Sequence, residues 1–261
     1  MTDPGLMAVV VAHPGHELVI HHWMEREPSL YFCLTDGSGG DGLSRMESTG
    51  LLLSSLGATP GSLYGRYTDR QVYRFLLEQR LDIFLALRDE LAESMIDAGV
   101  TRVAGDAVEG FNPVHDLCRG LIDGAVDLIR TRTGRVVRND EFKVVEPAPH
   151  VHWRAATSGL PLDGAALLRK ITAAKAYPEM QEEVQRALDR FGVQAFAIES
   201  LLPSSLATMM EKYEGTPPAY EAFGKIRVDE GRYDEIIRYR AHLLPTFDAL
   251  RMVRHVSQSA S

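Results

Sequence analysis

Residues 7–12 read MAVVVA and are followed by HPGHE at residues 13–17. The first stretch is a continuous, β-branched apolar run without alternation, which predicts a parallel strand covered on both faces. Pro14 disfavours helical backbone at His13, and Gly15 permits a turn that other residues would find strained. This part of the chain therefore predicts a buried strand that ends in a polar turn with two histidines.

The same order of elements recurs twice further along the chain. Apolar runs at residues 29–34 and 101–104 end in polar stretches, which read TDGSGGDG from residue 35 and GDAVEGFN from residue 105. Such stretches favour loops, because a helix or strand would lose too much backbone entropy there. Helical patterns follow at residues 44–56, 72–98 and 113–130.

Strand, loop and helix repeated three times predict an α/β fold with a doubly wound, mostly parallel sheet. In such sheets, ligands bind beyond the carboxyl ends of the strands. We therefore expect the loops at residues 13–17, 35–45 and 105–116 to converge on one crevice.

The chain changes character beyond residue 145, where two prolines mark a break. Helical patterns follow at residues 167–175 and 180–191, and a short strand is predicted at residues 194–198. No Gly/Ser linker separates the two parts. We therefore predict one domain over residues 1–261, with an α/β core at about 1–146 and a C-terminal elaboration at about 147–261.

The composition excludes several classes of protein. The net charge of −8, from 28 basic and 36 acidic side chains, disfavours binding to nucleic acid or anionic lipid. No apolar run approaches the roughly 20 residues of a membrane helix, and no basic leader precedes the first apolar stretch.

Cys33 and Cys118 lie in apolar surroundings, which favours reduced thiols and a cytoplasmic location. The sequence allows a homo-oligomer without indicating one.

A nucleotide cofactor is not expected, although the fold class invites one. The dinucleotide fingerprint requires G-x-G-x-x-G directly after the first strand, where this chain has HPGHE. The G-x-x-x-x-G-K-[ST] phosphate-binding motif is also absent from the sequence.

Three histidines in the predicted loops indicate a metal site instead. His13 and His16 flank Pro-Gly in a tight turn, and His115 stands near the start of the helix after the third strand. Three protein ligands with an open fourth position are typical of catalytic zinc, and iron or another first-row divalent metal also suits imidazole. A single loop histidine is more often only hydrogen-bonded, but three at one end of a sheet favour a metal. His150 and His152 can line the crevice or lie on a strand surface.

Four stretches of the chain together resemble the LmbE/PIG-L superfamily of zinc-dependent N-deacetylases. They read VVVAHPGHE from residue 9, LTDGSGG from residue 34, SRMEST leading to SLGA from residue 44, and GDAVEGFNPVHD from residue 105. The resemblance covers roughly residues 7–130. It implies a Rossmann-like fold and removal of an acyl group from an N-acyl amino sugar. By position, it implies metal binding by His13, His16 and His115, and substrate binding by Arg45 and the neighbouring Glu47.

The chain departs from the family pattern at residues that matter for catalysis. The family's general-base Asp is Gly15 here, and one of its metal-binding Asp residues is His16. Asn112 replaces a histidine that helps stabilise the oxyanion, and Val114 replaces an Asp. The amide N–H of Asn112 can serve as an oxyanion donor. The candidate bases in the convergent loops are Glu17, Asp36, Asp106 and Glu109. Such acids also commonly bind backbone N–H groups, so the base assignment stays open.

The C-terminal part adds one candidate substrate-binding residue, Arg238, in the run Arg-Tyr-Arg at 238–240. Arginine and tyrosine together suit a sugar or an anionic substituent, although a charged amphipathic helix has the same pattern. We therefore predict a zinc-dependent hydrolase of linear amides, an N-deacetylase with a small sugar-like substrate. The alternatives are another metal-assisted reaction on a sugar-like or amino-acid-like metabolite, and a sugar-binding relative without catalysis.

Overall fold

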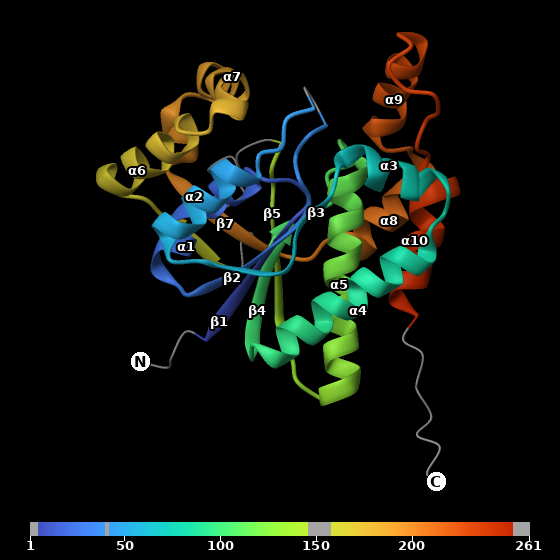
Figure 1. Ribbon diagram of the computed structural model, residues 1–261, viewed down its shortest axis with the longest axis horizontal. Coiled ribbons are helices and arrows are strands. Elements are labelled where there is room, and N and C mark those ends of the chain that lie inside the picture. Colours follow the sequence, from blue (N-terminus) through green and yellow to red (C-terminus); the bar gives the residue numbers. More distant parts are fainter. Residues whose placement is uncertain (1–4, 40–41, 146–157, 253–261) are drawn as a thin grey trace.

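A seven-stranded sheet forms the centre of the computed structural model, which describes residues 5–39, 42–145 and 158–252 (Figure 1). The strand order is β3-β2-β1-β4-β5-β7-β6. Neighbouring strands from β3 through β5 are parallel, whereas β7 is antiparallel to both β5 and β6. The strands are β1 (Leu6–Val11), β2 (Ser29–Thr35), β3 (Thr59–Tyr67), β4 (Val100–Asp106), β5 (Arg138–Phe142), β6 (Ser158–Pro161) and β7 (Ile198–Pro203). The predicted α/β class with a mostly parallel sheet is confirmed.

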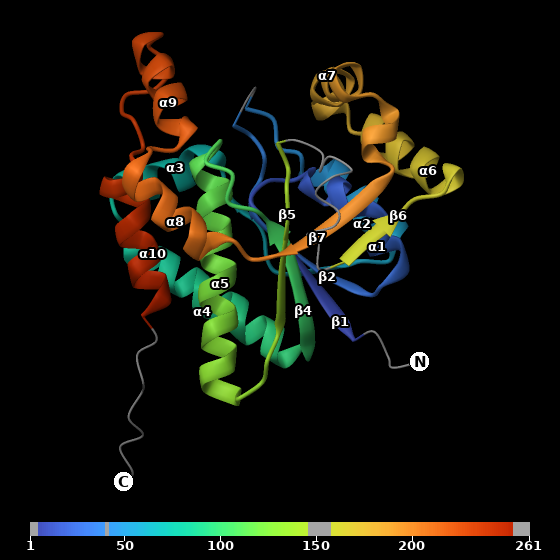
Figure 2. The same ribbon diagram turned by 180° about the vertical axis from the view of Figure 1, so that it is seen from behind.

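Helices cover both faces of this sheet (Figures 1 and 2). In chain order they are α1 (His21–Arg26), α2 (Met46–Leu56), α3 (Asp69–Leu77), α4 (Leu81–Asp97), α5 (Pro113–Thr133), α6 (Gly164–Lys175), α7 (Gln181–Phe191), α8 (Leu206–Gly215), α9 (Ala219–Asp229) and α10 (Leu244–Arg251). Shorter turns are η1 (His16–Ile20), η3 (Pro178–Met180), η4 (Val193–Phe196) and η5 (Tyr239–Leu243).

The central strand β1 is buried on both faces, as its unbroken apolar sequence predicts. Ala8 and Val10 pack in a core with α4, α5, α8 and α10. Met7, Val9 and Val11 face the opposite way, towards η1, α1 and α2. Alternate side chains of one strand thus supply two hydrophobic layers, which fixes the register and the position of the loop that follows.

Two predicted elements were wrong. The helix expected over residues 72–98 is broken into α3 and α4, because Gln79 adopts a left-handed backbone with φ of 52°. Its side-chain amide donates to backbone oxygens of Leu76 and His242, which stabilises the break. The strand expected over residues 194–198 is mostly the turn η4, and strand β7 begins at Ile198.

The C-terminal part adds strands to the same sheet and helices to its faces. Strand β7 pairs with β5, while α6 contacts α1 and η1. Lys170 on α6 is buried; its Nζ donates to Val19 O (2.7 Å) and to Glu199 Oε1 (2.9 Å). Glu199 also accepts the backbone N–H groups of His22 and Trp23 at the start of α1. The organisation as one domain with a boundary near residue 146 stays a prediction, because residues 146–157 lie outside the described ranges.

Among the residues that the structure describes, no helix has the length and apolar character needed to cross a membrane.

Candidate functional site

Three imidazole rings lie together at the carboxyl edge of the sheet. His13 follows β1, His16 begins η1, and His115 lies in the first turn of α5. The ring centroids of His13 and His16 are 5.3 Å apart, those of His13 and His115 are 5.1 Å apart, and those of His16 and His115 are 4.6 Å apart. All three side chains are buried. We call these residues the histidine cluster. It joins the loops at residues 13–17 and 105–116.

The turn between His13 and His16 depends on Gly15. Its φ of 102° is a conformation that L-residues rarely adopt. A Cβ atom at position 15 would also overlap the Sδ atom of Met180, which comes from η3 in the C-terminal part. A thioether therefore fills the space that a side chain at this position would need.

Asp106 orients His16 within the cluster. The Asp106 carboxylate is fully buried at the end of β4, where it accepts the Ala12 backbone N–H (2.8 Å). Its oxygens lie 2.9 and 3.0 Å from Nδ1 of His16. Burial alone would lower the pKa of His16, but the charge of Asp106 and its hydrogen bond raise that pKa above its ordinary value. In the neutral ring, Nδ1–H donates to Asp106 and Nε2 of His16 keeps its lone pair.

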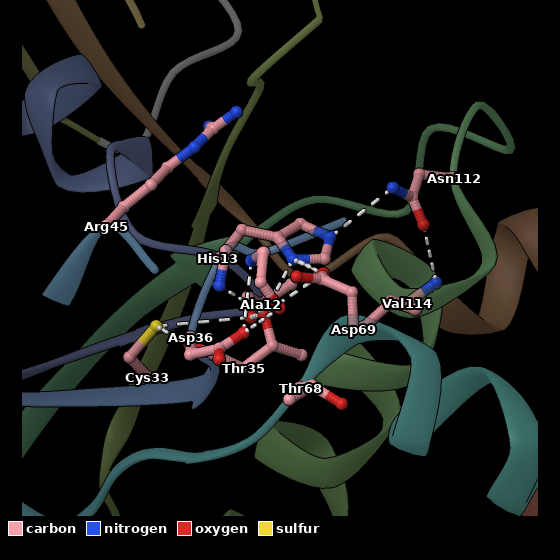
Figure 3. A network of polar contacts seen from close by, with 12 residues as sticks. Ala12, His13, Cys33, Thr35, Asp36, Arg45, Thr68, Asp69, Asn112 and Val114 are labelled. Atoms are coloured by element: carbon pink, nitrogen blue, oxygen red, sulfur yellow. Dashed lines mark hydrogen bonds and ion pairs between the residues drawn. The ribbon is translucent and has the colours of Figure 1, made fainter. Parts of the chain in front are cut away.

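His13 has an analogous carboxylate partner, Asp69, at the start of α3 (Figure 3). Nδ1 of His13 lies 2.6 Å from Asp69 Oδ1 and 2.8 Å from Thr35 Oγ1. Burial would raise the pKa of Asp69, but hydrogen bonds from His13 and Thr35 and the charge of His13 hold it below its usual value. On the other side of the ring, the amide Nδ2 of Asn112 lies 3.3 Å from Nε2. Sequence reasoning missed Asp69, because no strand was predicted before it.

His115 completes the cluster without a carboxylate partner on Nδ1, which is buried and unpaired in the described residues. Burial and the neighbouring rings of His16 and His13 lower the pKa of His115 well below its ordinary value. The imidazole is therefore neutral, which is the form that binds metals.

The donor set fits a divalent metal in its chemistry. Two of the three imidazoles donate Nδ1–H to carboxylates, as metal-binding histidines commonly do, and the third has a buried, unpartnered nitrogen. In the arrangement shown, however, no group of three or more His, Cys, Asp or Glu side chains among the described residues could hold a metal ion. Metal binding by these side chains therefore stays a prediction.

Asn112 lies beside the cluster and also begins α5. Its Oδ1 accepts the Val114 backbone N–H (2.9 Å), so the side chain is held as a helix N-cap. This bond directs the amide Nδ2 towards His13, as Figure 3 shows. The N–H donor predicted for an oxyanion therefore faces the cluster.

Glu17, one of the candidate bases, is fully buried and holds the turn together. Its Oε2 accepts the Gly15 backbone N–H and the Tyr31 hydroxyl, each at 2.9 Å. Its Oε1 accepts a hydrogen bond from the Tyr177 hydroxyl. Both phenols have pKa values raised by burial, so they stay protonated and donate.

Asp36 and Glu109, two further candidate bases, hold loops through one oxygen each. Oδ1 of Asp36 accepts the backbone N–H and the hydroxyl of Ser38. Oε1 of Glu109 accepts the backbone N–H groups of Val144 and Val145. Burial raises the pKa of Glu109 above its ordinary value.

The candidate substrate-binding residues lie in different places. Arg45 precedes α2, and its Nη2 lies 3.3 Å from Glu183 Oε1. Glu47 is exposed in the first turn of α2. Arg238 is exposed and lines a cavity of about 220 Å³ whose lining includes none of the three histidines. The role of Arg238 in substrate binding stays a prediction. His150 and His152 lie outside the described residues.

Comparison with known proteins supports the fold. No protein-family model and no curated protein matches the sequence. The structure is similar to the zinc-inhibited form of teicoplanin deacetylase Orf2, with a TM-score of 0.50 and 13% identity over 76% of this chain and 98% of that chain. The conserved protein TT1542 from Thermus thermophilus is also similar, with a TM-score of 0.48 and 20% identity over 77% of this chain and 94% of that chain. The A40926 pseudoaglycone deacetylase Dbv21 has a TM-score of 0.47 and 17% identity over 77% of this chain and 97% of that chain. At these identities, the shared feature is the fold alone.

Proposed function

We propose that this protein is a metal-dependent amidohydrolase of the LmbE/PIG-L type, an N-deacetylase that cleaves the linear amide of an N-acyl amino sugar or a related small metabolite. The observation that carries the proposal is the histidine cluster, whose ring centroids lie 4.6–5.3 Å apart. The similarity in fold to a deacetylase is consistent with this function. We place the protein in the cytoplasm, because Cys33 and Cys118 are free and buried.

In this proposal, His13, His16 and His115 bind zinc or another first-row divalent metal. Such a metal polarises a bound carbonyl group and lowers the pKa of water. Asp69 and Asp106 fix the ring orientation of His13 and His16, since each accepts a hydrogen bond from Nδ1–H.

We assign the remaining roles to residues that the sequence motifs single out. Asn112 donates its amide N–H to the oxygen that gains negative charge when the acyl carbon is attacked. Arg45, with Glu47 nearby, binds polar groups of the substrate. In the part of the chain that the structure describes, the loop hydrogen bonds of Asp36 and Glu109 use one carboxylate oxygen each, and we assign proton transfer to one of these two residues.

One observation favours a second candidate function. The Met180 thioether fills the space at Gly15, where the resemblance leads one to expect a carboxylate base. A site with that change suits another metal-assisted reaction on a sugar-like or amino-acid-like metabolite, or sugar binding without turnover.

Metal analysis combined with substrate screening separates these functions. We expect purified protein to bind one zinc ion per chain and to release the acyl acid from N-acyl amino sugars. His115→Ala should lose both properties. His22→Ala is a matched control, because this partly buried histidine pairs with Glu25 and lies outside the cluster. Full activity without any metal would contradict the proposal, and metal binding without turnover would support the second candidate.

A further inference from the structure

A short segment of the C-terminal part contacts the turn of the histidine cluster. Tyr177 and Met180 both reach the loop at residues 13–17, the first through Glu17 and the second through Gly15. In both views, α6 and α7, which flank this segment, lie on the side of the sheet that carries α1 and α2 (Figures 1 and 2). A segment 160 residues away in sequence, counted from Glu17 to Tyr177, therefore supports the turn between His13 and His16.

The contact between Tyr177 and Glu17 is fully enclosed. Tyr177 is 2% exposed and Glu17 is 0% exposed, so water does not compete for the hydrogen bond between them. The hydroxyl of Tyr177 also lies 3.0 Å from Thr49 Oγ1 on α2. A buried carboxylate is costly unless its oxygens are hydrogen-bonded, so the phenol that satisfies Oε1 is important for keeping Glu17 in place.

Glu17 in turn fixes the backbone of the turn. Its Oε2 accepts the Gly15 N–H at 2.9 Å, and Gly15 has the unusual φ of 102°. The conformation of Gly15 sets how His13 and His16, on either side of it, face each other. A chain of contacts thus leads from Tyr177 to the geometry of the two rings.

Neighbouring residues of the same segment reinforce this attachment. The Glu179 carboxylate accepts the Ser48 hydroxyl at 2.8 Å, and Glu183 pairs with Arg45. Residues 177–183 therefore contact both the turn and the start of α2.

We propose that Tyr177 is a positioning residue of the histidine cluster, which acts through Glu17 to hold the Gly15 turn in the conformation that brings His13 and His16 together. The expected effect on metal binding rests on the proposed function, whereas the effect on the turn does not.

Tyr177→Phe tests this inference, because it removes only the hydroxyl. Hydrogen exchange of the metal-free protein should become about fivefold faster at residues 13–18, as expected for the loss of one ordinary hydrogen bond. Affinity for Zn²⁺ alone, measured by competition with a chromophoric chelator, should fall about tenfold, the low end of the effect of outer-shell changes. Tyr239→Phe is the matched control, since Tyr239 is equally buried and its hydroxyl contacts Met210 O. It should change neither quantity.

Glu17→Gln provides a second route to the same result if Tyr177→Phe does not fold. It should accelerate exchange in the same peptide. The double variant should lose no more Zn²⁺ affinity than the more affected single variant, because the two residues act in series. Unchanged exchange at residues 13–18 in both single variants would overturn the inference. If the wild-type protein binds no Zn²⁺, the proposed function fails, and the exchange measurement still decides the role of Tyr177.

Discussion

Replacing Asp106 by Asn changes one hydrogen bond of the histidine cluster while keeping the shape of the side chain. In the native protein, the Asp106 carboxylate accepts both the Ala12 backbone N–H and Nδ1–H of His16. An Asn at this position keeps one acceptor for Ala12 and presents an NH₂ group to His16. Because that NH₂ group would lie 3.0 Å from Nδ1 and the carboxylate charge is gone, we expect the tautomer of His16 with its proton on Nε2 to become favoured. That nitrogen then loses the lone pair with which it would bind a metal.

The expected magnitude follows from this exchange of tautomer. Loss of a carboxylate partner of a metal-binding histidine typically weakens metal affinity about 10–100-fold, or about 1.4–2.7 kcal/mol. The free energy of unfolding of the metal-free protein should fall by about 1.5–3 kcal/mol, the value of a buried hydrogen bond to a charged group.

Two measurements test this prediction. Competition with a chromophoric chelator gives the Zn²⁺ affinity, and ¹⁵N NMR of the imidazole nitrogens reports the tautomer of His16 directly. Asp123→Asn is the control, since Asp123 accepts hydrogen bonds from Asn139 and Ser204 and has no contact with the cluster. Wild-type affinity with an unchanged tautomer in Asp106→Asn would refute the reasoning.

Three further predictions concern stability. Gly15→Asp should lower the free energy of unfolding by about 2–5 kcal/mol, from backbone strain and overlap with Met180. Adding Met180→Ala should reveal a favourable coupling of about 1–3 kcal/mol, measured by urea denaturation. Lys170→Met should cost about 3–5 kcal/mol in the same assay, because it leaves the carboxylate of a buried ion pair without its partner. Hydrogen bonding to Arg169 lowers the pKa of Glu25 from 4.5 to about 2. The ionised Glu25 carboxylate therefore contributes fully to the free energy of unfolding above pH 4.5, and this contribution is lost as the pH falls towards 2. Glu25→Gln should remove that part of the acid dependence.

Controls of the same chemical type accompany these variants. Lys225→Met removes an exposed lysine from an i,i+4 pair and should cost under about 1 kcal/mol. Glu78→Gln changes the exposed acid of another ion pair with an arginine and serves as the control for Glu25→Gln. Additive effects of Gly15→Asp and Met180→Ala would show that the thioether does not restrict position 15. An equal decrease in the free energy of unfolding for Lys170→Met and Lys225→Met would show that burial of the Lys170–Glu199 pair is unimportant.

The central strands of the fold could be predicted from the sequence, because a buried strand must be apolar along its length. Strands β1 and β2 and helix α5 bury continuous or periodic apolar side chains, which local patterns record directly. Strand β5 reads RNDEF and has no such pattern. Its Asp140 is buried because Arg102 and Arg138 pair with it, and these arginines lie on β4 and β5. A strand stabilised by pairing of charges between strands cannot be recognised from its own residues.

The candidate site was predictable to the same limited extent. The grouping of His13, His16 and His115 follows from strand order, because parallel strands direct their following loops to one edge. Asp69 was missed because strand β3, which leads to it, contains Pro60 and two glycines and was not recognised as a strand. Tyr177 was missed because its contact with Glu17 depends on tertiary packing alone.

Because β7 pairs with β5, the part of the chain that carries the sequence motifs cannot be separated from the C-terminal part. A fragment excised before residue 146 would leave β5 as an open edge, with backbone groups that β7 normally satisfies. Glu141 would also lose the hydrogen bonds that it accepts from the Ser205 hydroxyl and backbone N–H. Such a fragment would tend to pair with other copies of itself and precipitate. Transplanting this chemistry into another scaffold would therefore need the whole sheet.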